Sequence, residues 1–397
     1  MGSSRSCGQS DMGVAPGHWG RNGQATESRS FSEEARELKV LRFLLVFVPL
    51  AVIAEVWLKD RPWGNQAVFV ASALGLMPLA GLLGEATEQL AERTGPRLGG
   101  FLNATLGNAA ELILTIVALR AGEQELVKAS ITGSILGNLL LILGLSMLAG
   151  GLKNGRQRFD RDLAGLSSTM MSLAVIGLTV PTLFYGLHGS QVDQPLEYLS
   201  WGVAGVLLFL YALSVLFAFT TAWLDDEVRA LTPLPAPLSH RRAWSVGVSL
   251  AVLAVATVGT VFLSEFLVGA IEPVVSSWGV SRLFLGVVVV PLVGNVAEHL
   301  VGVQMAWKNQ MQLSLSISLN SSMQVALFVA PVLVFVSLFL HGPAGAMDLH
   351  FYPFEVICLG LSVVLATFIS QDGRSHWLEG AALLAVYAVI ALAFFFL

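Results

Sequence analysis

The pattern Gly-Asn-x-Ala-Glu occurs twice in this chain, each time inside an apolar segment long enough to cross a lipid bilayer. The first copy is Gly107–Glu111, and the second, 187 residues later, is Gly294–Glu298. An ionisable side chain at membrane depth is costly, so its presence indicates a functional site. The two acids occupy equivalent positions of the same motif, one in each half of the chain. Such a pair predicts a transporter built from an internal repeat.

The composition also indicates a membrane protein. The chain has 397 residues, of which 55% are hydrophobic and only 12% charged, and its mean hydropathy is +0.72. Soluble domains carry about 25% charged residues, so most of this chain is expected to lie in lipid. The net charge of −5 is mild and gives no sign of a nucleic-acid partner. Cys7 and Cys358 form neither a disulfide framework nor a metal-ligand spacing.

About 20 apolar residues cross a bilayer as a helix, and eleven such segments predict eleven transmembrane helices. They lie at residues 40–58, 66–91, 99–120, 125–150, 163–184, 199–223, 243–270, 283–307, 311–340, 352–370 and 377–396. With the N-terminus inside, the inner segments hold 17 of the 22 Lys and Arg residues and the outer segments hold 5. Because positive charge favours the cytoplasmic side, this bias predicts a cytoplasmic N-terminus and an outer C-terminus.

The predicted fold is an all-α membrane protein with two inverted five-helix repeats. Residues 1–38, rich in Ser, Gly and charge, are expected to form a disordered cytoplasmic tail. An extra first helix (39–62) precedes the first repeat (63–224), and a short acidic, Pro-containing linker (225–242) leads to the second repeat (243–397). Five spans are an odd number, so the second copy enters the membrane upside down. This arrangement places the substrate near the midplane, where the repeats meet.

The 187-residue frame aligns further polar residues. Ser134 falls opposite Ser321, and in both halves the serine follows the motif glutamate by 23 residues. Glu85 falls opposite Glu272, although the neighbouring residues agree poorly. Ser134 and Asn138 are four residues apart, so they share one helix face. Each half is thus expected to present an Asn–Glu face and a Ser–amide face.

Seven side chains from the two halves would offer oxygen atoms to one midplane site: Asn108, Glu111, Ser134, Asn295, Glu298, Ser321 and Gln324. Ca²⁺ takes about six to eight oxygen ligands, and the lack of a thiolate or His cluster disfavours Zn²⁺ and Cu⁺. Pro291 cannot donate to the carbonyl of Val287, so a free backbone oxygen is expected near the site. Gly107 and Gly294 would allow close backbone approach.

The motif carboxylates would also bind protons, because burial and a second negative charge both favour the protonated form. Competition between a divalent cation and protons for one site is the basis of an exchanger. His299 would be a proton-sensitive neighbour of Glu298, with a packing role as the alternative. Glu85, Glu88 and Glu272 would gather cations at the entrances, or would be surface acids at span ends. The shared register of the motif acids disfavours a purely structural role for both.

These residues resemble the Ca²⁺/H⁺ antiporters of the cation/Ca²⁺ exchanger superfamily, over about residues 40–397. Residues 99–111 resemble the first family signature, residues 291–299 the second, and Ser134 and residues 321–324 the polar stretches that follow. The resemblance implies eleven spans, two inverted repeats and a midplane Ca²⁺ site. It also implies that the motif glutamates carry Ca²⁺ and protons, that the Asn, Ser and Gln side chains line the site, and that the histidine assists the proton step.

The sequence departs from the family pattern at three places. Val296 stands where the family commonly has Ala, which is a minor change. Gly137 stands where Ser is common, which would remove one oxygen. The acidic stretch often found between the halves is reduced to Asp225–Glu227, which weakens the case for Ca²⁺ sensing by that loop.

The sequence thus predicts a secondary transporter, not an enzyme, that exchanges Ca²⁺ for H⁺ by alternating access and needs no cofactor. Na⁺-driven Ca²⁺ exchange or Mn²⁺/H⁺ exchange is the nearest alternative, because an all-oxygen site suits hard ions generally. A channel is a weaker alternative. So is an intramembrane enzyme with a Glu298–His299 acid–base pair, because no second His or nucleophile motif completes it.

The expected partners are Ca²⁺, H⁺ and membrane lipid, without nucleic acid, and the oligomeric state is left open. The expected location is a prokaryotic plasma membrane, with an acidic organelle as the alternative.

Overall fold

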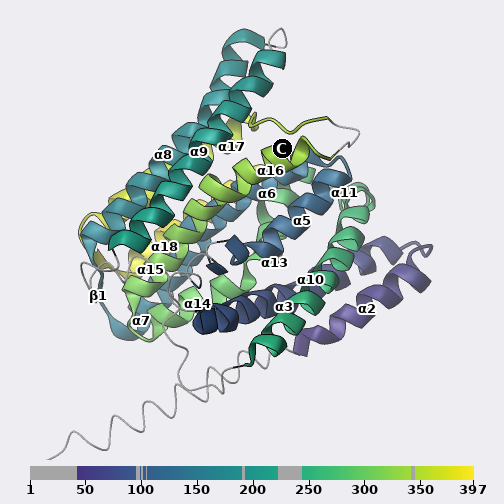
Figure 1. The fold of residues 1–397 in the computed structure, drawn as a ribbon, viewed down its shortest axis with the longest axis horizontal. Helices are drawn as coiled ribbons and strands as arrows, with labels where there is room; N and C mark the ends of the chain where they lie inside the picture. Colours follow the sequence, from purple (N-terminus) through teal and green to yellow (C-terminus); the bar gives the residue numbers. More distant parts are fainter. Residues whose placement is uncertain are drawn as a thin grey trace, which may run out of the picture. The chain divides into compact units, whose positions relative to one another are not determined.

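The computed structural model of the protein is built almost wholly from helices (Figure 1). The structure describes residues 43–94, 99, 102–103, 105–189, 193–221, 244–340 and 345–397. The chain divides into two units, residues 1–43 and residues 44–397, and only Phe43 of the first unit is described. The predicted tail (1–38) and the predicted linker (225–242) therefore lie outside the described residues.

The described part of the first half contains, in chain order, η1 (Leu44–Val46), α2 (Phe47–Ile53), η2 (Ala54–Leu58), α3 (Gly64–Thr94), α5 (Ala109–Arg120), α6 (Gln124–Leu136), η3 (Gly137–Ile142), α7 (Leu143–Asn154), β1 (Gln157–Arg158), α8 (Arg161–His188) and α9 (Asp193–Thr221). The second half contains α10 (Val246–Gly269), α11 (Ile271–Trp278), α12 (Arg282–Phe284), η6 (Leu285–Val289), α13 (Val290–Gly294), α14 (Val296–Trp307), α15 (Met311–Gln324), η7 (Val325–Val329), α16 (Ala330–Ser337), α17 (Pro353–Ser370), β2 (Arg374–Ser375) and α18 (Trp377–Phe396). Buried apolar side chains from both halves form one continuous core.

Eight of the eleven predicted spans coincide with helices long and apolar enough to cross a membrane, counted over the described residues. The exceptions are the predicted spans 40–58, 99–120 and 283–307. The first corresponds to a short apolar helix, Leu44–Leu58. The other two contain the repeated motif, where the helix is interrupted. The helices thus support a multi-pass membrane protein with eight continuous candidate spans among the described residues, and the other three spans stay a prediction.

The chain leaves helical geometry at the same point of both motifs. Asn108 (φ −94°, ψ 21°) precedes α5, and Asn295 (φ −103°, ψ 9°) precedes α14. Both following helices run for 12 residues, and their bounds differ by 187 positions. The π-helical segments η3 and η7 follow α6 and α15. When residue numbers are shifted by 187, the bounds of these two segments agree to within one residue. The repeat therefore extends to the local backbone, and each motif glutamate lies in the first turn of a helix.

The long helices α3 and α10 pack closely against each other (Figure 1). A β-carbon added at Gly75 would lie 2.6 Å from Leu263 Cδ2, and one added at Gly259 would lie 3.1 Å from Leu79 Cδ1. Each glycine thus receives a leucine of the other helix, as small residues commonly do where membrane helices cross. Gly259 and Leu263 follow Gly75 and Leu79 by 184 residues each. The contact is therefore reciprocal, as across a local two-fold axis.

Near the C-terminal end of α7, short loops from both halves meet in what we call the Arg158 end. The strands β1 and β2 pair antiparallel, with Arg158 opposite Arg374. Gln157 Nε2 donates to the Ala306 carbonyl oxygen (2.8 Å) and to Asn309 Oδ1 (3.1 Å). The span count with an inner N-terminus predicts all of these loops on the inner side.

A second group of contacts lies near the N-terminal end of α6, which we call the Lys128 end. Lys128 forms an ion pair with Asp348, and Arg282 forms one with Glu123 (3.5 Å). These residues come from segments that the span count places together on the outer side. Contacts at both ends thus agree with the predicted alternation of the spans.

Gly133 of α6 packs directly against η6 and α13. A β-carbon at Gly133 would lie 2.1 Å from the Val287 carbonyl oxygen and 2.6 Å from Pro291 Cγ. The Val287 carbonyl oxygen, to which Pro291 cannot donate, therefore faces Gly133 of α6. Gly137, four residues later, has no atom within 4 Å of such a carbon. Of the two glycines, only the first is a close helix-packing position.

We expect Gly133→Ala to destabilise the folded protein by about 1–3 kcal/mol, because the backbone must move to admit the methyl group. Gly137→Ala is the matched control, since it adds the same group to the same continuous helix in open space. Heating each purified variant in detergent and measuring the remaining monodisperse fraction gives the two midpoints. Equal midpoints would contradict the close packing at Gly133.

Candidate functional site

Glu111, Ser134 and Asn295 form a buried chain of hydrogen bonds, which we call the Glu111 network. Ser134 Oγ donates to Glu111 Oε1 (2.9 Å), and Asn295 Nδ2 donates to Ser134 Oγ (3.1 Å). The three residues are only 8%, 3% and 3% exposed, respectively. The acid and the serine come from α5 and α6 of the first half, whereas the amide comes from the motif of the second half. The network therefore joins the two halves.

Glu298, Ser321 and Asn138 form a matching chain, the Glu298 network. Ser321 Oγ donates to Glu298 Oε2, and Asn138 Nδ2 donates to Ser321 Oγ (2.9 Å). The acid and the serine come from α14 and α15, and the amide from η3 of the first half. In both networks an amide donates to a hydroxyl, which donates to a carboxylate. The serine that bonds each glutamate is the one 23 residues later, as the sequence frame aligned them.

The amide side chains break this symmetry. Asn108 Nδ2 donates to Gln324 Oε1 (2.7 Å), whereas strict repetition would direct it to Ser321. The amide that bonds Ser321 belongs to Asn138 instead. The two halves therefore supply different amides to equivalent places, and the site is only approximately two-fold.

Asn138 is the site residue that sequence reasoning did not select. Its counterpart in the 187-residue frame is Val325, so the repeat gives no signal for it. Its spacing of four from Ser134 puts both on one helix face, which was visible in the sequence. Its partner, Ser321, lies in the other half of the chain, and one helix alone cannot predict that contact.

Two buried oxygens at the site accept no hydrogen bond within the described residues: Glu111 Oε2 and Asn108 Oδ1. Buried polar atoms are usually paired, so these two are available to bind an ion or a water molecule. Carboxylate, amide and hydroxyl oxygens are the ligands that hard cations prefer. No group of three or more His, Cys, Asp and Glu side chains gathers among the described residues.

The other predicted site residues lie as follows. His299 is buried in α14, directly after Glu298, and its Nε2 has no hydrogen-bond partner in the described part of the chain. A β-carbon at Gly107 would lie 2.6 Å from the Asn103 carbonyl oxygen, so the motif turn there is too tight for a side chain. A β-carbon at Gly294 would lie 3.5 Å from Glu111 Cγ, which is an ordinary contact.

The three acids predicted at the entrances lie near helix ends. Glu272, whose side chain is 60% exposed, forms an ion pair with Arg282 at the Lys128 end. Glu85 and Glu88 are half-buried in the last three turns of α3. Glu272 is thus engaged away from both networks, and a role in gathering cations stays a prediction for all three acids.

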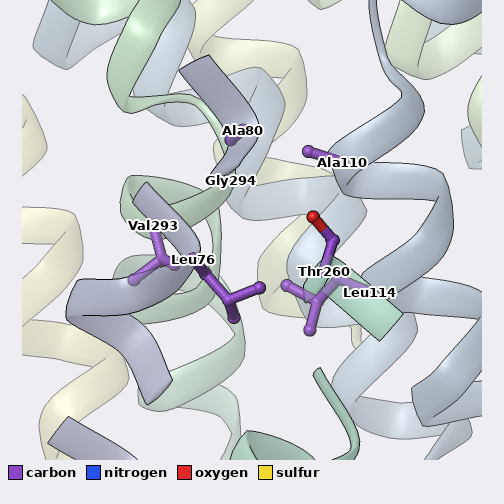
Figure 2. Close-up of a pocket in the computed structure, with 7 residues that line it drawn as sticks. All are labelled: Leu76, Ala80, Ala110, Leu114, Thr260, Val293 and Gly294. Atoms are coloured by element: carbon purple, nitrogen blue, oxygen red, sulfur yellow. The ribbon is translucent and has the colours of Figure 1, made fainter. Parts of the chain in front are cut away.

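A small crevice lies beside the backbone of the two motifs, and Figure 2 shows the residues that line it. Its lining residues come from α3, α5, α10 and α13: Leu76, Ala80, Ala110, Leu114, Thr260, Val293 and Gly294. Ala110 directly precedes Glu111, and Gly294 directly precedes Asn295. The crevice therefore meets the network at the backbone of both motifs.

The family model of the sodium/calcium exchanger proteins matches residues 65–220 and 248–396 of this chain. The chain belongs to this family of membrane transporters, and it is a transport protein rather than an enzyme. The matched regions fall one in each half, and each contains one copy of the Gly-Asn-x-Ala-Glu motif.

Individual relatives cover most of the chain. A Ca²⁺/H⁺ antiporter of Aphanothece halophytica is 42% identical over 362 residues, which are 89% of this chain and 95% of that protein. A vacuolar calcium ion transporter of Schizosaccharomyces pombe is 37% identical over 89% of this chain and 84% of its own length. The solved structure of native YfkE superposes with a TM-score of 0.76 at 36% identity, covering 91% of this chain and all of that one.

We expect Ser321→Ala to lower the free energy of unfolding by about 1–3 kcal/mol, because it leaves the amide of Asn138 and the carboxyl of Glu298 without their shared partner. Ser318→Ala is the matched control on the same helix, since the Ser318 hydroxyl is buried and has no hydrogen-bond partner among the described residues. Thermal midpoints of both variants in detergent would test this. A control as unstable as Ser321→Ala would show that the network does not stabilise the fold.

Proposed function

We propose that this protein exchanges Ca²⁺ for H⁺ across a membrane by alternating access. The observation that carries the proposal is the pair of matched carboxylate–hydroxyl–amide networks, each built from both halves of the chain. Relatives named Ca²⁺/H⁺ antiporters, at up to 42% identity over nearly the whole chain, support the choice of ions.

The proposed chemistry is competition for Glu111 and Glu298. Without the cation, each glutamate accepts a hydrogen bond from its serine, and a proton on the carboxyl group removes the buried charge. When Ca²⁺ arrives, both carboxylates lose their protons and bind the cation, and each serine hydroxyl rotates so that its oxygen faces the ion. The side chains of Asn108, Asn295 and Gln324 supply further oxygens, with water completing the coordination.

His299 is proposed to receive or release the proton of Glu298, because it is the next residue and has an unpaired ring nitrogen. An empty site would leave two carboxylate charges unpaired inside the membrane. The carrier is therefore proposed to change its open side only when the site holds either Ca²⁺ or protons, and this rule couples the two ions in exchange.

We further propose that residues 63–224 and 243–397 are inverted repeats of five spans each, with residues 39–62 as an extra helix. Three observations support this arrangement. The bounds of α5 and α14 match, the contacts between α3 and α10 are reciprocal, and the loops meet at the two ends in the order that the span count predicts. The distribution of Lys and Arg favours a cytoplasmic N-terminus. We place the protein in a prokaryotic plasma membrane, where its exchange would export Ca²⁺.

A second candidate is exchange with a different ion, either Na⁺-driven Ca²⁺ exchange or Mn²⁺/H⁺ exchange. The all-oxygen character of the site favours hard cations as a class and does not by itself select among them. Ca²⁺ uptake into proteoliposomes with an acidic interior, in buffer free of Na⁺ and K⁺, separates the candidates. Uptake that stops when the pH gradient is collapsed supports proton coupling, whereas uptake that requires Na⁺ or K⁺ on the opposite side overturns it.

We expect Glu111→Gln and Glu298→Gln each to reduce Ca²⁺ uptake at least about 100-fold, because glutamine keeps the shape but neither carries the charge nor exchanges the proton. Asp162→Asn serves as the control for loss of one acid, since the side chain of Asp162 is 92% exposed and lies outside both networks. Size-exclusion profiles establish that all three variants are folded. Near-normal uptake by either glutamine variant would refute the proposed roles.

Protons are expected to act as competitive inhibitors on the side from which Ca²⁺ binds. Lowering the pH there protonates the carboxylates, so the KM for Ca²⁺ rises while the rate at saturating Ca²⁺ is unchanged. Toward acidic pH the KM increases about 100-fold per pH unit if both glutamates must lose a proton, and about tenfold if only one must. A KM independent of pH would show that protons and Ca²⁺ do not share the site.

A further inference from the structure

Thr260 is the one polar side chain that lines the crevice beside the Glu111 network, among the lining residues that the structure describes. The side chain is 1% exposed, and its hydroxyl has no hydrogen-bond partner in the described part of the chain. In Figure 2 its oxygen is directed toward the side of the crevice where Ala110 lies. The crevice is otherwise bounded by aliphatic side chains and glycine, so nothing in its lining satisfies this hydroxyl.

The unpaired hydroxyl of Thr260 is shared with Thr87 on α3 and with Ser249 and Ser264 on α10, but of these only Thr260 lines the crevice. Thr115, Thr179 and Thr367 each donate to the carbonyl oxygen four residues earlier, at 2.6, 2.7 and 2.8 Å. Such bonds are the ordinary local solution for a helical threonine. Thr260 does not make one, and a buried polar group without a partner destabilises the fold. Its place in the lining of the crevice distinguishes Thr260 from the other unpaired hydroxyls among the described residues, and this place is what suggests a function for its oxygen.

The position of Thr260 is fixed by the crossing of α3 and α10. The neighbouring residue Gly259 packs against Leu79 of α3, and this contact holds the turn of α10 that carries Thr260 against the first half. At the 184-residue offset of the crossing, the counterpart of Thr260 is Leu76, which lines the same crevice with an apolar side chain. The hydroxyl is therefore not a product of the repeat and has no equivalent on α3.

We propose that Thr260 Oγ1 is a ligand for the partly dehydrated cation as it passes between the crevice and Glu111. This assignment rests on the proposed function. A divalent cation that enters an apolar crevice loses water, and a hydroxyl oxygen replaces part of the lost hydration. Glu111 Oε2 is also unpaired, and Glu111 directly follows Ala110 of the crevice lining. Thr260 thus adds an α10 ligand to a site otherwise built from the two motifs and the serine helices.

Thr260→Val tests this proposal, because valine keeps the shape of threonine and removes only the oxygen. Thr260→Ser keeps the hydroxyl. Thr87→Val is the matched control, since Thr87 is 0% exposed, has an unpaired hydroxyl on α3 and does not line the crevice. Each purified variant is reconstituted, and initial Ca²⁺ uptake is measured as a function of Ca²⁺ concentration. Equilibrium binding of radioactive Ca²⁺ to the detergent-purified proteins supplies a readout that needs no transport.

We expect Thr260→Val to raise both the KM and the dissociation constant for Ca²⁺ about tenfold, the effect of losing one ligand to a charged group. Thr260→Ser and Thr87→Val should stay within about twofold of the wild type. Wild-type values for Thr260→Val, or an equal loss in Thr260→Ser or Thr87→Val, would overturn the assignment. Wild-type protein that binds and transports no Ca²⁺ would refute the proposed function itself, whereas a defect confined to Thr260→Val leaves that function standing.

Discussion

The burial of two carboxyl groups inside an apolar helical body is the constraint on which the rest of the structure depends. A charge in such surroundings needs compensation from hydrogen bonds or from a bound cation. The protein provides part of it with Ser134 and Ser321, each held in turn by an amide from the opposite half. Each half supplies the serine for its own glutamate, but neither half alone supplies the amide that holds that serine. The hydrogen bonds that hold the site residues in place therefore also join the two halves of the chain.

Much of this fold was predictable because its strongest signals are local. Long apolar segments gave eight spans that the structure contains, and the repeated motif with its 23-residue spacing gave both Glu–Ser contacts. The motif segments were predicted as whole spans, yet the chain breaks at Asn108 and Asn295, because hydropathy does not register the backbone angles that a Gly-Asn turn adopts. Continuous apolar sequence predicts membrane depth better than it predicts a continuous helix.

The parts that sequence could not provide depend on contacts between the halves. Asn138 sits opposite Val325 in the repeat frame, so its bond to Ser321 required the packed structure. The pairing of Asn108 with Gln324 is of the same kind. Thr260 lies on a helix that carries no motif and became visible only when the lining of the crevice was known. An internal repeat thus locates the charged groups, whereas tertiary packing decides which neutral groups complete the site.

The reciprocal Gly75–Leu263 and Gly259–Leu79 contact has a thermodynamic consequence. A contact related to itself by a two-fold axis in the membrane plane looks the same from either side of the bilayer. In the proposed inverted arrangement this axis exchanges the two helices, so moving the α3–α10 pair as one body toward either face of the bilayer would give arrangements that are related by the axis and equal in energy at that crossing. Any intrinsic preference of the carrier for one open side must come from groups that break the repeat, such as the Asn108–Gln324 pair. In the proposed exchanger, the helix crossing itself would therefore favour neither open side.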